Sequence, residues 1–522
     1  MNPGVRSRFA CVATGVVFAM FVLAGCSPVG PDFVAPETDA AEQWTQPIEE
    51  GLQTADPDTV EWWHVFADPV LDELVASAKR GNNNLEIAGL RVLEARAQLG
   101  IATGRQYPQT QLAAGDATYI GPADNTGVTS NFWQYSLGAT AAWEIDFWGR
   151  FRRGIESSDA AYLASIAAYD QSSVLLSAQV VDTYTVIRAT QEQLRIAREN
   201  VVLQQRSYDI AEVLFENGSD SELDMQQANT LLLATKATIP ALEVTYKQAR
   251  NALSTLLGLR PGAVDTMLID AQSIPAIPNP ISIGFPAAML RRRPDVRQAE
   301  LQAMSQNALV GFAEADLYPS FSLAGSIGLV AGNPGDSDFG DLFDTDALTF
   351  SIGPSFVWPF LNYGRIKNSV RVQDARLQQA LVNYRETVLQ AAREAEDAMA
   401  GFIGAREQSV ILKETVTSAK RSNDLSTLRY QEGFSDYERV LDSQRSLFSQ
   451  QQRYITTRGE AVRNLVALYK ALGGGWETRE GLPRIDAATL ETMRERTDWG
   501  ELIDETEPPA EPAGDLWRRP DW

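Results

Sequence analysis

Few side chains in this 522-residue chain are of the types that carry nucleophilic or metal chemistry. The sequence holds two cysteines, Cys11 and Cys26, and a single histidine, His64. Histidine-based catalysis and metal binding need several such groups in one place, so we interpret His64 as a surface or packing residue. The chain also has no phosphate-binding GxxxxGK[ST] sequence and no nucleophile elbow. We therefore predict a protein that is not an enzyme and that has no cofactor and no metal site.

A second group of chemical interest is a set of aspartates beside two glycine turns. Asp220 and Asp224 follow the first turn, and Asp436 and Asp442 follow the second. Carboxylates gathered around a narrow passage repel one another, raise their own pKa values and attract cations. As isolated surface groups, the same aspartates would serve as turn and helix-cap residues. Which of these two roles the aspartates have depends on where the helices and turns that carry them lie in the fold.

Cys26 closes an N-terminal export signal. The chain begins with MNPGVRSR, which has two arginines and no acid, and continues with the apolar stretch 9–23. A positive start and a short apolar stretch are typical of an export signal, and the stretch is too short for a comfortable membrane span. The sequence Leu23-Ala24-Gly25-Cys26 resembles the lipobox of bacterial lipoproteins. The resemblance implies cleavage before Cys26, a diacylglycerol on its sulfur and an acyl group on its new amine. The alternative is an ordinary signal with a chance cysteine.

The residues around the signal also indicate a destination. Ser27 follows the cysteine, where an aspartate would suggest retention in the inner membrane, so the lipoprotein rule implies the outer membrane. With Cys11 removed and Cys26 acylated, no thiol remains to mispair in an oxidising periplasm. The formal net charge is −23, and loss of the two arginines of the signal leaves about −25. Because phosphate binding needs concentrated positive charge, nucleic acid is excluded as a partner.

The chain contains two copies of one unit. EIDFWGRFRRGI resembles FLNYGRIKNSV, and LFENGSDSELDMQQA resembles RYQEGFSDYERVLDSQ. These pairs align Gly149 with Gly364 and Gly218 with Gly433, at a constant offset of 215. A long repeat with a constant offset indicates duplication rather than a solenoid. Each copy is predicted to hold a helix of about twenty residues, two strands, a very long helix, a glycine turn and a second helix.

The repeats divide the chain into six parts. These are a signal peptide (1–25), an N-terminal lipid-anchored segment (26–83), repeat 1 (84–257), an inter-repeat linker (258–293), repeat 2 (294–475) and an acidic, proline-containing C-terminal tail (476–522). The composition of the tail predicts that it is loosely ordered.

The long helix of each repeat carries a heptad pattern. Steps of seven from Ile166 reach Val180, Ile187 and Leu194, and no proline interrupts residues 149–216. Such a helix would be ~100 Å long, which is far longer than a globular core requires. A heptad alone is more typical of an ordinary bundle or coiled coil than of a channel.

The strand segments alternate between apolar and polar or small residues. WQYSLGATAAW places Leu137 on an apolar face, and FSLAGSIGL places Leu323 on another, whereas TQLAAGDATYI alternates much more weakly. Strands of this length and pattern are typical of transmembrane β-barrels, and the alternative is a periplasmic sandwich with one buried face. No internal stretch is apolar enough for a transmembrane helix, so a further membrane crossing must use strands. Four strands cannot close a barrel in lipid, so a membrane interpretation requires several chains to share one barrel.

At the level of whole segments, the sequence resembles the TolC-like outer-membrane factor family, in its NodT-type lipoprotein branch. The resemblance rests on LAGC, VGPDFVAP, WWHVFADPVLDELV, RRRPDVRQAE and YQEGFSDYERVLDSQ, and it covers almost all of residues 22–475. It implies an α+β membrane protein in which three tandem-repeat chains share a twelve-stranded transmembrane β-barrel, four strands per chain. A long α-helical barrel would continue this channel across the periplasm.

The function implied by the resemblance is passive export. An inner-membrane efflux pump and a periplasmic adaptor protein would deliver drugs or other small toxic molecules, and a homotrimer of this chain would conduct them outside. Lipid of the outer membrane would surround the barrel and hold the anchor on Cys26. An exit duct for secreted proteins uses the same fold and stays open as an alternative. A structural or cell-wall-acting periplasmic lipoprotein would fit the heptads but leaves the alternating strands unexplained.

The resemblance also assigns a role to the aspartates. Family members constrict the tunnel at the far tips of their helical hairpins, and Asp442 matches the family's aperture aspartate. Asp436, Asp220 and Asp224 are further candidates for this constriction. Arg439 stands where a second acid is frequent, which argues against a double acidic ring.

The first prediction is that Cys26 is acylated. Mass spectrometry of the N-terminal peptide of the purified protein should show a chain that begins at Cys26 and carries the mass of its lipids. A free cysteine, or an intact signal, would contradict the lipoprotein assignment.

Overall fold

The computed structural model describes most of the chain. The described residues are 28–36, 44–45, 52–54, 60–121, 130–219, 221–268, 273–278, 280–283, 292–332, 338–477 and 483–504. The acylation site predicted at Cys26 and the candidate Asp220 lie outside these residues.

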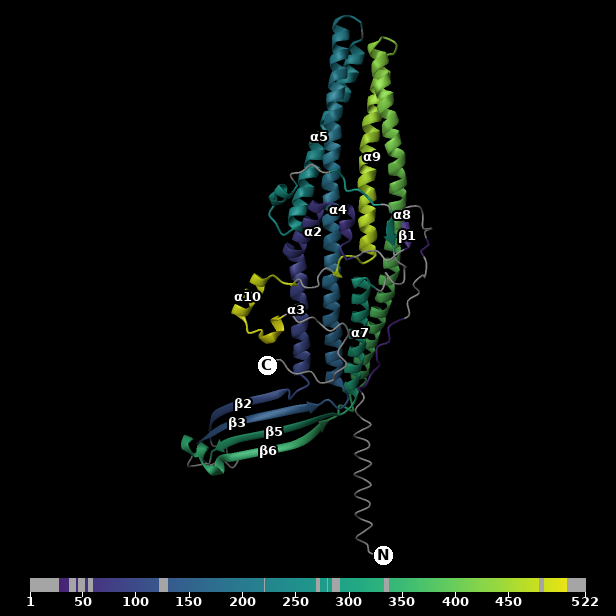
Figure 1. Cartoon of the computed structure of the whole chain (residues 1–522). Coiled ribbons are helices and arrows are strands. Elements are labelled where there is room, and N and C mark those ends of the chain that lie inside the picture. Colours follow the sequence, from purple (N-terminus) through teal and green to yellow (C-terminus); the bar gives the residue numbers. More distant parts are fainter. Residues whose placement is uncertain are drawn as a thin grey trace.

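Two helical hairpins form a long rod. The helices α4 (Arg150–Glu216) and α8 (Arg365–Gln431) have 67 residues each, and each returns through a 35-residue helix, α5 (Glu222–Leu256) or α9 (Tyr437–Ala471). Figure 1 shows both hairpins side by side, with their turns at one end of the molecule and the sheet at the other. The equal lengths in the two copies confirm the tandem repeat. None of the described helices is both long and apolar enough to cross a membrane.

Shorter helices complete the rod below the hairpins. The helix α3 (Asn83–Gly104) packs on α4, and α7 (Pro294–Glu314) packs between α4 and α8. Because α4 contacts α3, α5, α7 and α9, it is largely buried, whereas α8 contacts mainly α7 and α9 and leaves one side exposed. The two copies therefore have the same length but not the same surroundings.

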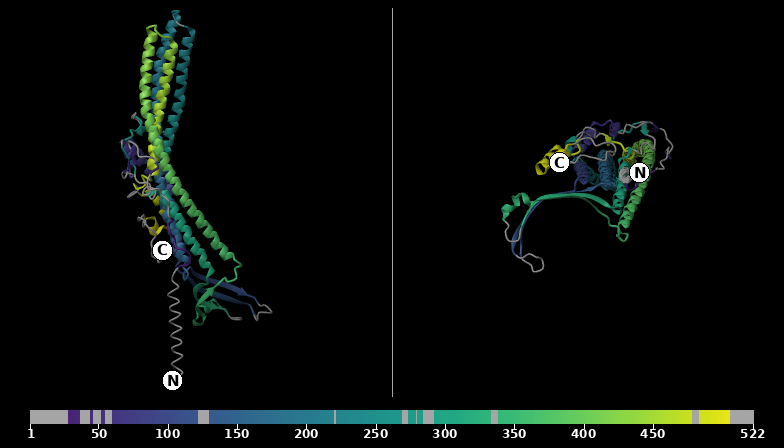
Figure 2. Two further views of the ribbon diagram at one scale, coloured as in Figure 1. Left: turned by 90° about the vertical axis from the view of Figure 1, so that its right-hand side faces the viewer. Right: turned by 90° about the horizontal axis from the view of Figure 1, so that it is seen from below.

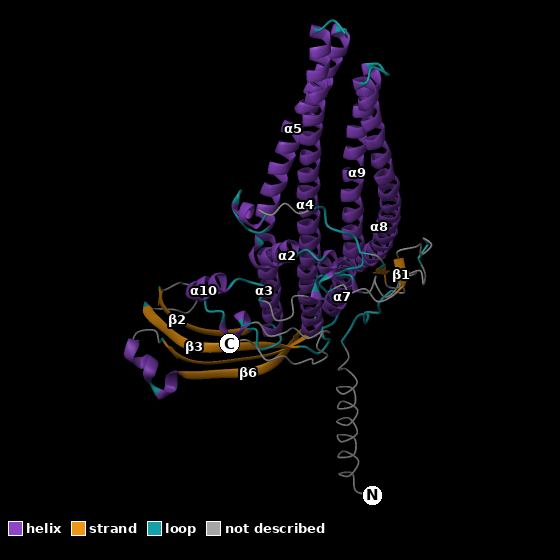
Figure 3. Ribbon diagram, turned by 45° about the horizontal axis from the view of Figure 1, so that its top comes forward, coloured by secondary structure: helices purple, strands orange, loops and turns teal. Residues whose placement is uncertain are grey.

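Four antiparallel strands form one sheet at the end of the rod. They are β2 (Thr110–Ile120), β3 (Phe132–Ile145), β5 (Ser320–Ala331) and β6 (Leu348–Val357), in the order β2-β3-β5-β6. Figures 2 and 3 show the sheet as a curved ribbon rather than a flat one. All four strands were predicted, including β2, whose alternating pattern was weak.

The register of the sheet separates two faces. On one face Leu137 lies opposite Leu329, and Ile327 lies opposite Phe350. Leu137, Ile327 and Phe350 are exposed, and Phe350 retains 78% of its accessible surface. Exposed apolar side chains over a whole sheet face indicate contact with lipid or with another protein.

The opposite face of the sheet is lined by hydroxyl groups. Thr140 lies opposite Ser326, which lies opposite Ser351, and the two serine Oγ atoms are 2.8 Å apart. Ser136 donates a hydrogen bond to Asp116 on the same face. The alternation predicted from the sequence therefore extends across β3, β5 and β6, whereas β2 follows it only in part, since Leu112 lies opposite Thr140 on the hydroxyl-lined face.

The chain wraps the middle of the rod in a small belt. The strand β1 (Leu52–Thr54) pairs in parallel with β4 (Ile281–Ile283), and η1 (Trp62–Phe66), α2 (Pro69–Gly81) and η2 (Ala263–Met267) lie nearby. The ring of Trp62 stacks on Tyr469 of α9 at 5.2 Å, which ties the belt to the second hairpin. Gly258 ends this part of repeat 1 with φ +69°, and a Cβ there would overlap the carbonyl oxygen of Gly81.

A half-buried lysine joins the belt to the chain that follows α9. Lys79 donates a hydrogen bond to the carbonyl oxygen of Gly475 at 2.9 Å, and its Nζ lies 4.4 Å from the centre of the Trp63 ring. Burial lowers the pKa of Lys79 to about 8. Contacts of a lysine with an aromatic face and a carbonyl oxygen partly replace the water that the ammonium group loses.

The C-terminal region corrects one expectation. A loosely ordered tail was predicted from residue 476, yet residues 483–504 contain α10 (Ala487–Arg496) and η7 (Gly500–Ile503). Met493 and Ile503 pack with Leu93 of α3, and Arg96 donates to the carbonyl oxygen of Leu502 at 2.8 Å. The average composition of the tail obscured these few apolar residues, which are spaced to cover one patch of α3.

The second prediction concerns the apolar sheet face. Leu137→Arg and Ile327→Arg should each sharply reduce the assembled fraction, because an arginine near the bilayer midplane costs ~2–4 kcal/mol. Leu323→Arg should have a smaller effect, since Leu323 lies four residues closer to the helices and the cost falls toward the membrane surface. Oligomer stability can be followed by electrophoresis in mild detergent.

The matched control is Ser326→Arg, which places the same charge on the hydroxyl-lined face. Equal losses from Ile327→Arg and Ser326→Arg would contradict a lipid-facing role for the apolar side.

Candidate functional site

The two hairpins turn at glycines with a left-handed backbone. Gly218 has φ +71° and Gly433 has φ +74°, which glycine adopts without strain. In each turn the glycine amide and the next amide donate back to carbonyl oxygens at the end of the long helix, at 2.8–2.9 Å. A Cβ at either glycine would meet no atom, so only the backbone angle requires glycine.

A small apolar core joins the two tips. It contains residues of all four hairpin helices, with its buried members on α4, α5 and α9: Ala211, Ala228, Leu231, Tyr437, Val440 and Leu441. Tyr430 of α8 packs against this core, with its ring centre 5.3 Å from that of Tyr437. This core fixes which face of each helix points inward at the tips.

Asp442 lies on the opposite face of α9 from this core. Val440, Leu441 and Gln444 are buried, whereas Asp442 is exposed, as expected when residues on a helix are spaced by 100°. Arg439, three residues earlier, is exposed as well. Within the described residues, no hydrogen bond or ion pair occupies the Asp442 carboxylate. The side chain is therefore available to face a passage or another subunit.

The other two described candidates lie at the N-terminal ends of α9 and α5. Asp436 is exposed at the N-cap of α9, where its side chain accepts no cap hydrogen bond. Asp224 accepts a hydrogen bond from Ser221 Oγ at 2.7 Å, while Ser221 Oγ accepts from the Asp224 amide. Negative charge at a helix N-terminus is stabilised by the helix dipole, which accounts for an acid at both positions. The structure therefore gives Asp224 a local role and leaves Asp442 and Asp436 unengaged.

The two tips differ in charge. This difference is missed when only the four aspartates of the sequence analysis are considered. From residue 207 to residue 235 there is no lysine or arginine, and five described acids surround the first turn: Asp209, Glu212, Glu216, Glu222 and Asp224. Around the second turn, residues 421–445 contain four arginines among five acids. A count of charges along each hairpin would have revealed that the first tip is purely acidic and the second is mixed.

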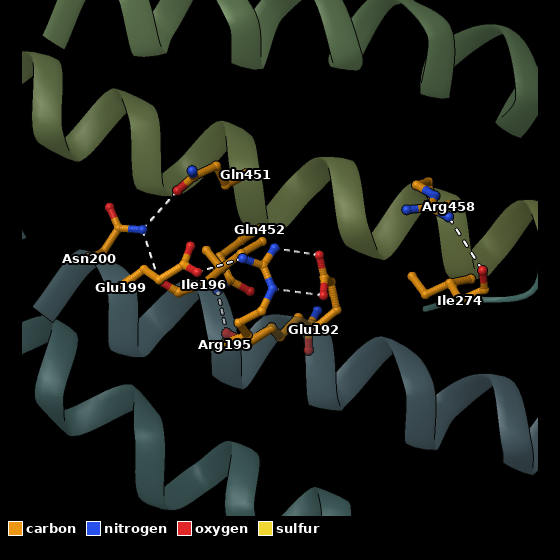
Figure 4. Close-up of polar contacts among 10 residues, drawn as sticks. Glu192, Arg195, Ile196, Glu199, Asn200, Ile274, Gln451, Gln452 and Arg458 are labelled. Atoms are coloured by element: carbon orange, nitrogen blue, oxygen red, sulfur yellow. Dashed lines mark hydrogen bonds and ion pairs between the residues drawn. The ribbon is translucent and has the colours of Figure 1, made fainter. Parts of the chain in front are cut away.

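A polar seam joins α4 to α9 behind the tips. Gln444 Nε2 donates to Ser207 Oγ at 2.6 Å, and Asn200 Nδ2 donates to Gln451 Oε1 at 2.8 Å. Figure 4 shows the second of these contacts crossing between the two hairpins. Gln444 and Asn200 are almost fully buried, so breaking these bonds would leave polar groups without water.

An ion cluster borders this seam on α4. Arg195 contacts Glu192 and Glu199 on its own helix, each at 2.6 Å, as Figure 4 shows. The hydrogen bond from Arg195 holds the pKa of Glu192 below its usual value. These contacts stay within one helix, so they do not tie the hairpins together.

Comparison with known proteins shows similarity over most of the chain. The model of a family described as "Outer membrane efflux protein" matches residues 74–259 and 286–474. The cation efflux system protein CusC of Escherichia coli is 30% identical over 456 residues, which are 87% of this chain and 97% of that protein. The antibiotic efflux pump outer membrane protein ArpC of Pseudomonas putida is 30% identical over 484 residues, 91% of this chain and 97% of that protein.

A solved structure shares the fold as well. The outer-membrane channel OprN is 33% identical to this chain and superposes with a TM-score of 0.81. The superposition covers 86% of this chain and 99% of that one, so most of this chain has a counterpart in a known channel.

Proposed function

This chain belongs to the outer membrane efflux protein family, and we propose that it is the exit duct of a tripartite efflux system. In this role it receives cargo from an inner-membrane pump and a periplasmic adaptor protein and conducts it passively to the exterior. The observation that carries the proposal is the combination of one sheet with a lipid-compatible face and two ~100 Å helices. The sheet matches the thickness of a membrane, and the helices extend the channel far into the periplasm.

Three copies complete the channel. The strands β2 and β6 are paired on one side only within the described residues, and lipid cannot satisfy the remaining backbone groups. Joining β6 of one copy to β2 of the next gives twelve strands from three chains. The exposed side of α8 supports the same arrangement, since Val382, Leu389 and Val410 lie at heptad spacing on it and are about half exposed.

The lining of the sheet suggests the kind of cargo. Asp116 and Glu144 are the only charged residues of the four strands, and hydroxyl groups dominate the face opposite the lipid. A wall of hydroxyl groups with little charge favours passage without tight binding. We therefore assign drugs and other small toxic organic molecules as cargo, in keeping with ArpC, whose name describes antibiotic efflux. CusC, whose name describes cation efflux, represents the competing assignment.

The third prediction tests this assignment in the source bacterium. Deletion of the gene should lower the inhibitory concentrations of several structurally unrelated drugs by several-fold, and the intact gene should restore them. The Leu137→Arg variant is the matched control, since the same chain would be made but not assembled. Unchanged drug resistance together with new sensitivity to metal cations would contradict the organic cargo while leaving the channel function in place.

We place the constriction of the channel at the hairpin tips, with Asp442 as its principal residue. The exposed carboxylate of Asp442 faces away from the tip core and has no partner among the described residues. Asp436 is close enough in sequence to contribute from the N-cap of α9, and Asp220 and Asp224 would add charge from the first hairpin. Because Arg439 shares the exposed face with Asp442, positive charge would lie beside each carboxylate of the ring.

The fourth prediction is that Asp442→Ala weakens cation selectivity in planar bilayers. The substitution removes three negative charges per trimer from one narrow annulus, where limited water strengthens their effect. Block by multivalent cations should weaken too. Asp424→Ala is the control, because Asp424 is an exposed carboxylate of α8 before the turn and its loss changes the net charge equally. Equal responses from both variants, or unchanged selectivity in Asp442→Ala, would remove Asp442 from the constriction.

A further inference from the structure

The first described residues of the chain are threaded through the junction between the sheet and the helices. The amide of Val29 donates to the carbonyl oxygen of Trp148, just beyond the end of β3, at 3.0 Å. Asn307 of α7 donates through Nδ2 to the carbonyl oxygen of Pro31 at 2.8 Å, and Asn307 is 4% exposed. Residues 28–31 are therefore held by elements of both repeats.

Arg153 of α4 is the centre of this attachment. Its guanidinium donates to the carbonyl oxygens of Val29 and Gly30, both at 3.1 Å, and to the carboxylate of Asp32 at 2.9 Å. Its remaining nitrogen donates to Glu156 at 2.8 Å. The side chain is only 4% exposed, and three of these four hydrogen bonds are directed at the N-terminal segment.

Three glycines make room for the segment. Gly30 has φ +91°, and a Cβ there would overlap the Cα of Gly311 on α7. A Cβ on Gly311 would lie 2.6 Å from the carbonyl oxygen of Val29, and one on Gly149 would lie 2.5 Å from Pro28. Backbone passes against backbone at these points, which leaves the segment no freedom to slide.

The attachment lies where the protein leaves the membrane. Trp148 stacks on Tyr318 with ring centres 4.6 Å apart, and Trp148 Nε1 donates to the carbonyl oxygen of Pro319 at 2.8 Å. Tryptophan and tyrosine favour the boundary between lipid and water. Only Ser27 separates Pro28 from Cys26, so a lipid on Cys26 has about 7 Å of chain beyond the fixed segment.

We propose that Arg153 is a positioning residue that locks the lipid-bearing N-terminus to the base of the barrel strands. The lock couples the membrane anchor to the fold, because acyl chains on Cys26 then enter the bilayer at one place and depth beside β3. Sheet edges that reach the membrane at a set depth meet those of neighbouring copies in register. The proposal rests on the acylation of Cys26 and on assembly of the duct, and it adds the element that joins them.

The test is a double-mutant cycle between the lock and the lipid. Arg153→Met keeps the length of the side chain but removes every donor. It is compared in the full-length lipoprotein and in a lipid-free form, made with an ordinary cleavable signal and Cys26→Ser. The readouts are the fraction of oligomer that survives mild detergent and the protease sensitivity of residues 28–36.

We expect Arg153→Met to reduce the assembled fraction several-fold in the lipoprotein and to have little further effect in the lipid-free form. Such non-additivity shows that the lock acts through the anchor. Gly30→Ala, which obstructs the same segment through a Cβ whose nearest atoms belong to Gly311 and Glu314 rather than to Arg153, should reproduce the result. In both variants the freed segment should become sensitive to protease.

Arg152→Met is the matched control, because Arg152 is a neighbouring, largely buried arginine whose guanidinium binds both the carboxylate and the carbonyl oxygen of Asp146 at 3.2 Å. Its effect should be the same with and without lipid. Equal losses from Arg153→Met in both backgrounds, or no loss in either, would overturn the proposal. Mass spectrometry of Cys26 separates this outcome from failure of acylation, and resistance to drugs separates it from failure of the efflux assignment.

Discussion

The unpaired backbone groups along β2 and β6 are the constraint on which the rest of the structure depends. Within the described residues each of these strands has a partner on one side only, and a hydrocarbon environment supplies neither donors nor acceptors. A sheet of four strands in a membrane therefore cannot be stable alone. Its two edge strands must pair with edge strands from other copies of the same chain. The curvature of the sheet, its two chemically distinct faces and the exposed heptad side of α8 all serve that pairing.

Duplication supplied the two hairpins, and their surroundings then diverged. In the first copy Asp146 accepts hydrogen bonds from the amides of Phe151 and Arg152 and so caps α4. At the offset of 215 the corresponding residue before α8 is Leu361, which is exposed. In the first copy, a carboxylate of the same chain thus accepts hydrogen bonds from the free amides at the start of the long helix. In the second copy, an exposed apolar residue stands at the same position. This difference matches the buried position of α4 and the exposed position of α8.

The fold was predictable from the sequence wherever apolar residues recurred at a regular spacing over a long segment. The heptads from Ile166 and the alternation around Leu137 predicted elements whose lengths and faces the structure confirms. Local chemistry was harder to predict. The capping bond between Ser221 and Asp224 and the acids of the first tip were overlooked because single aspartates were weighed without their neighbours. Arg153 and the packed residues around Met493 depend on contacts across more than a hundred positions, and no spacing in one sequence reveals such pairs.

The two glycine turns have a consequence for how this family can change. Gly218 and Gly433 need their left-handed backbone, yet no other atom lies near the place where a side chain would begin. The exposed residues of the turns, which lie outside the tip core, are thus released from the packing demands that govern the belt and the junction with the sheet. Substitutions there can alter charge and shape with little loss of folding free energy. Natural selection can therefore retune the end of the duct that meets other proteins while the membrane end stays the same, so new pairings can arise without a new fold.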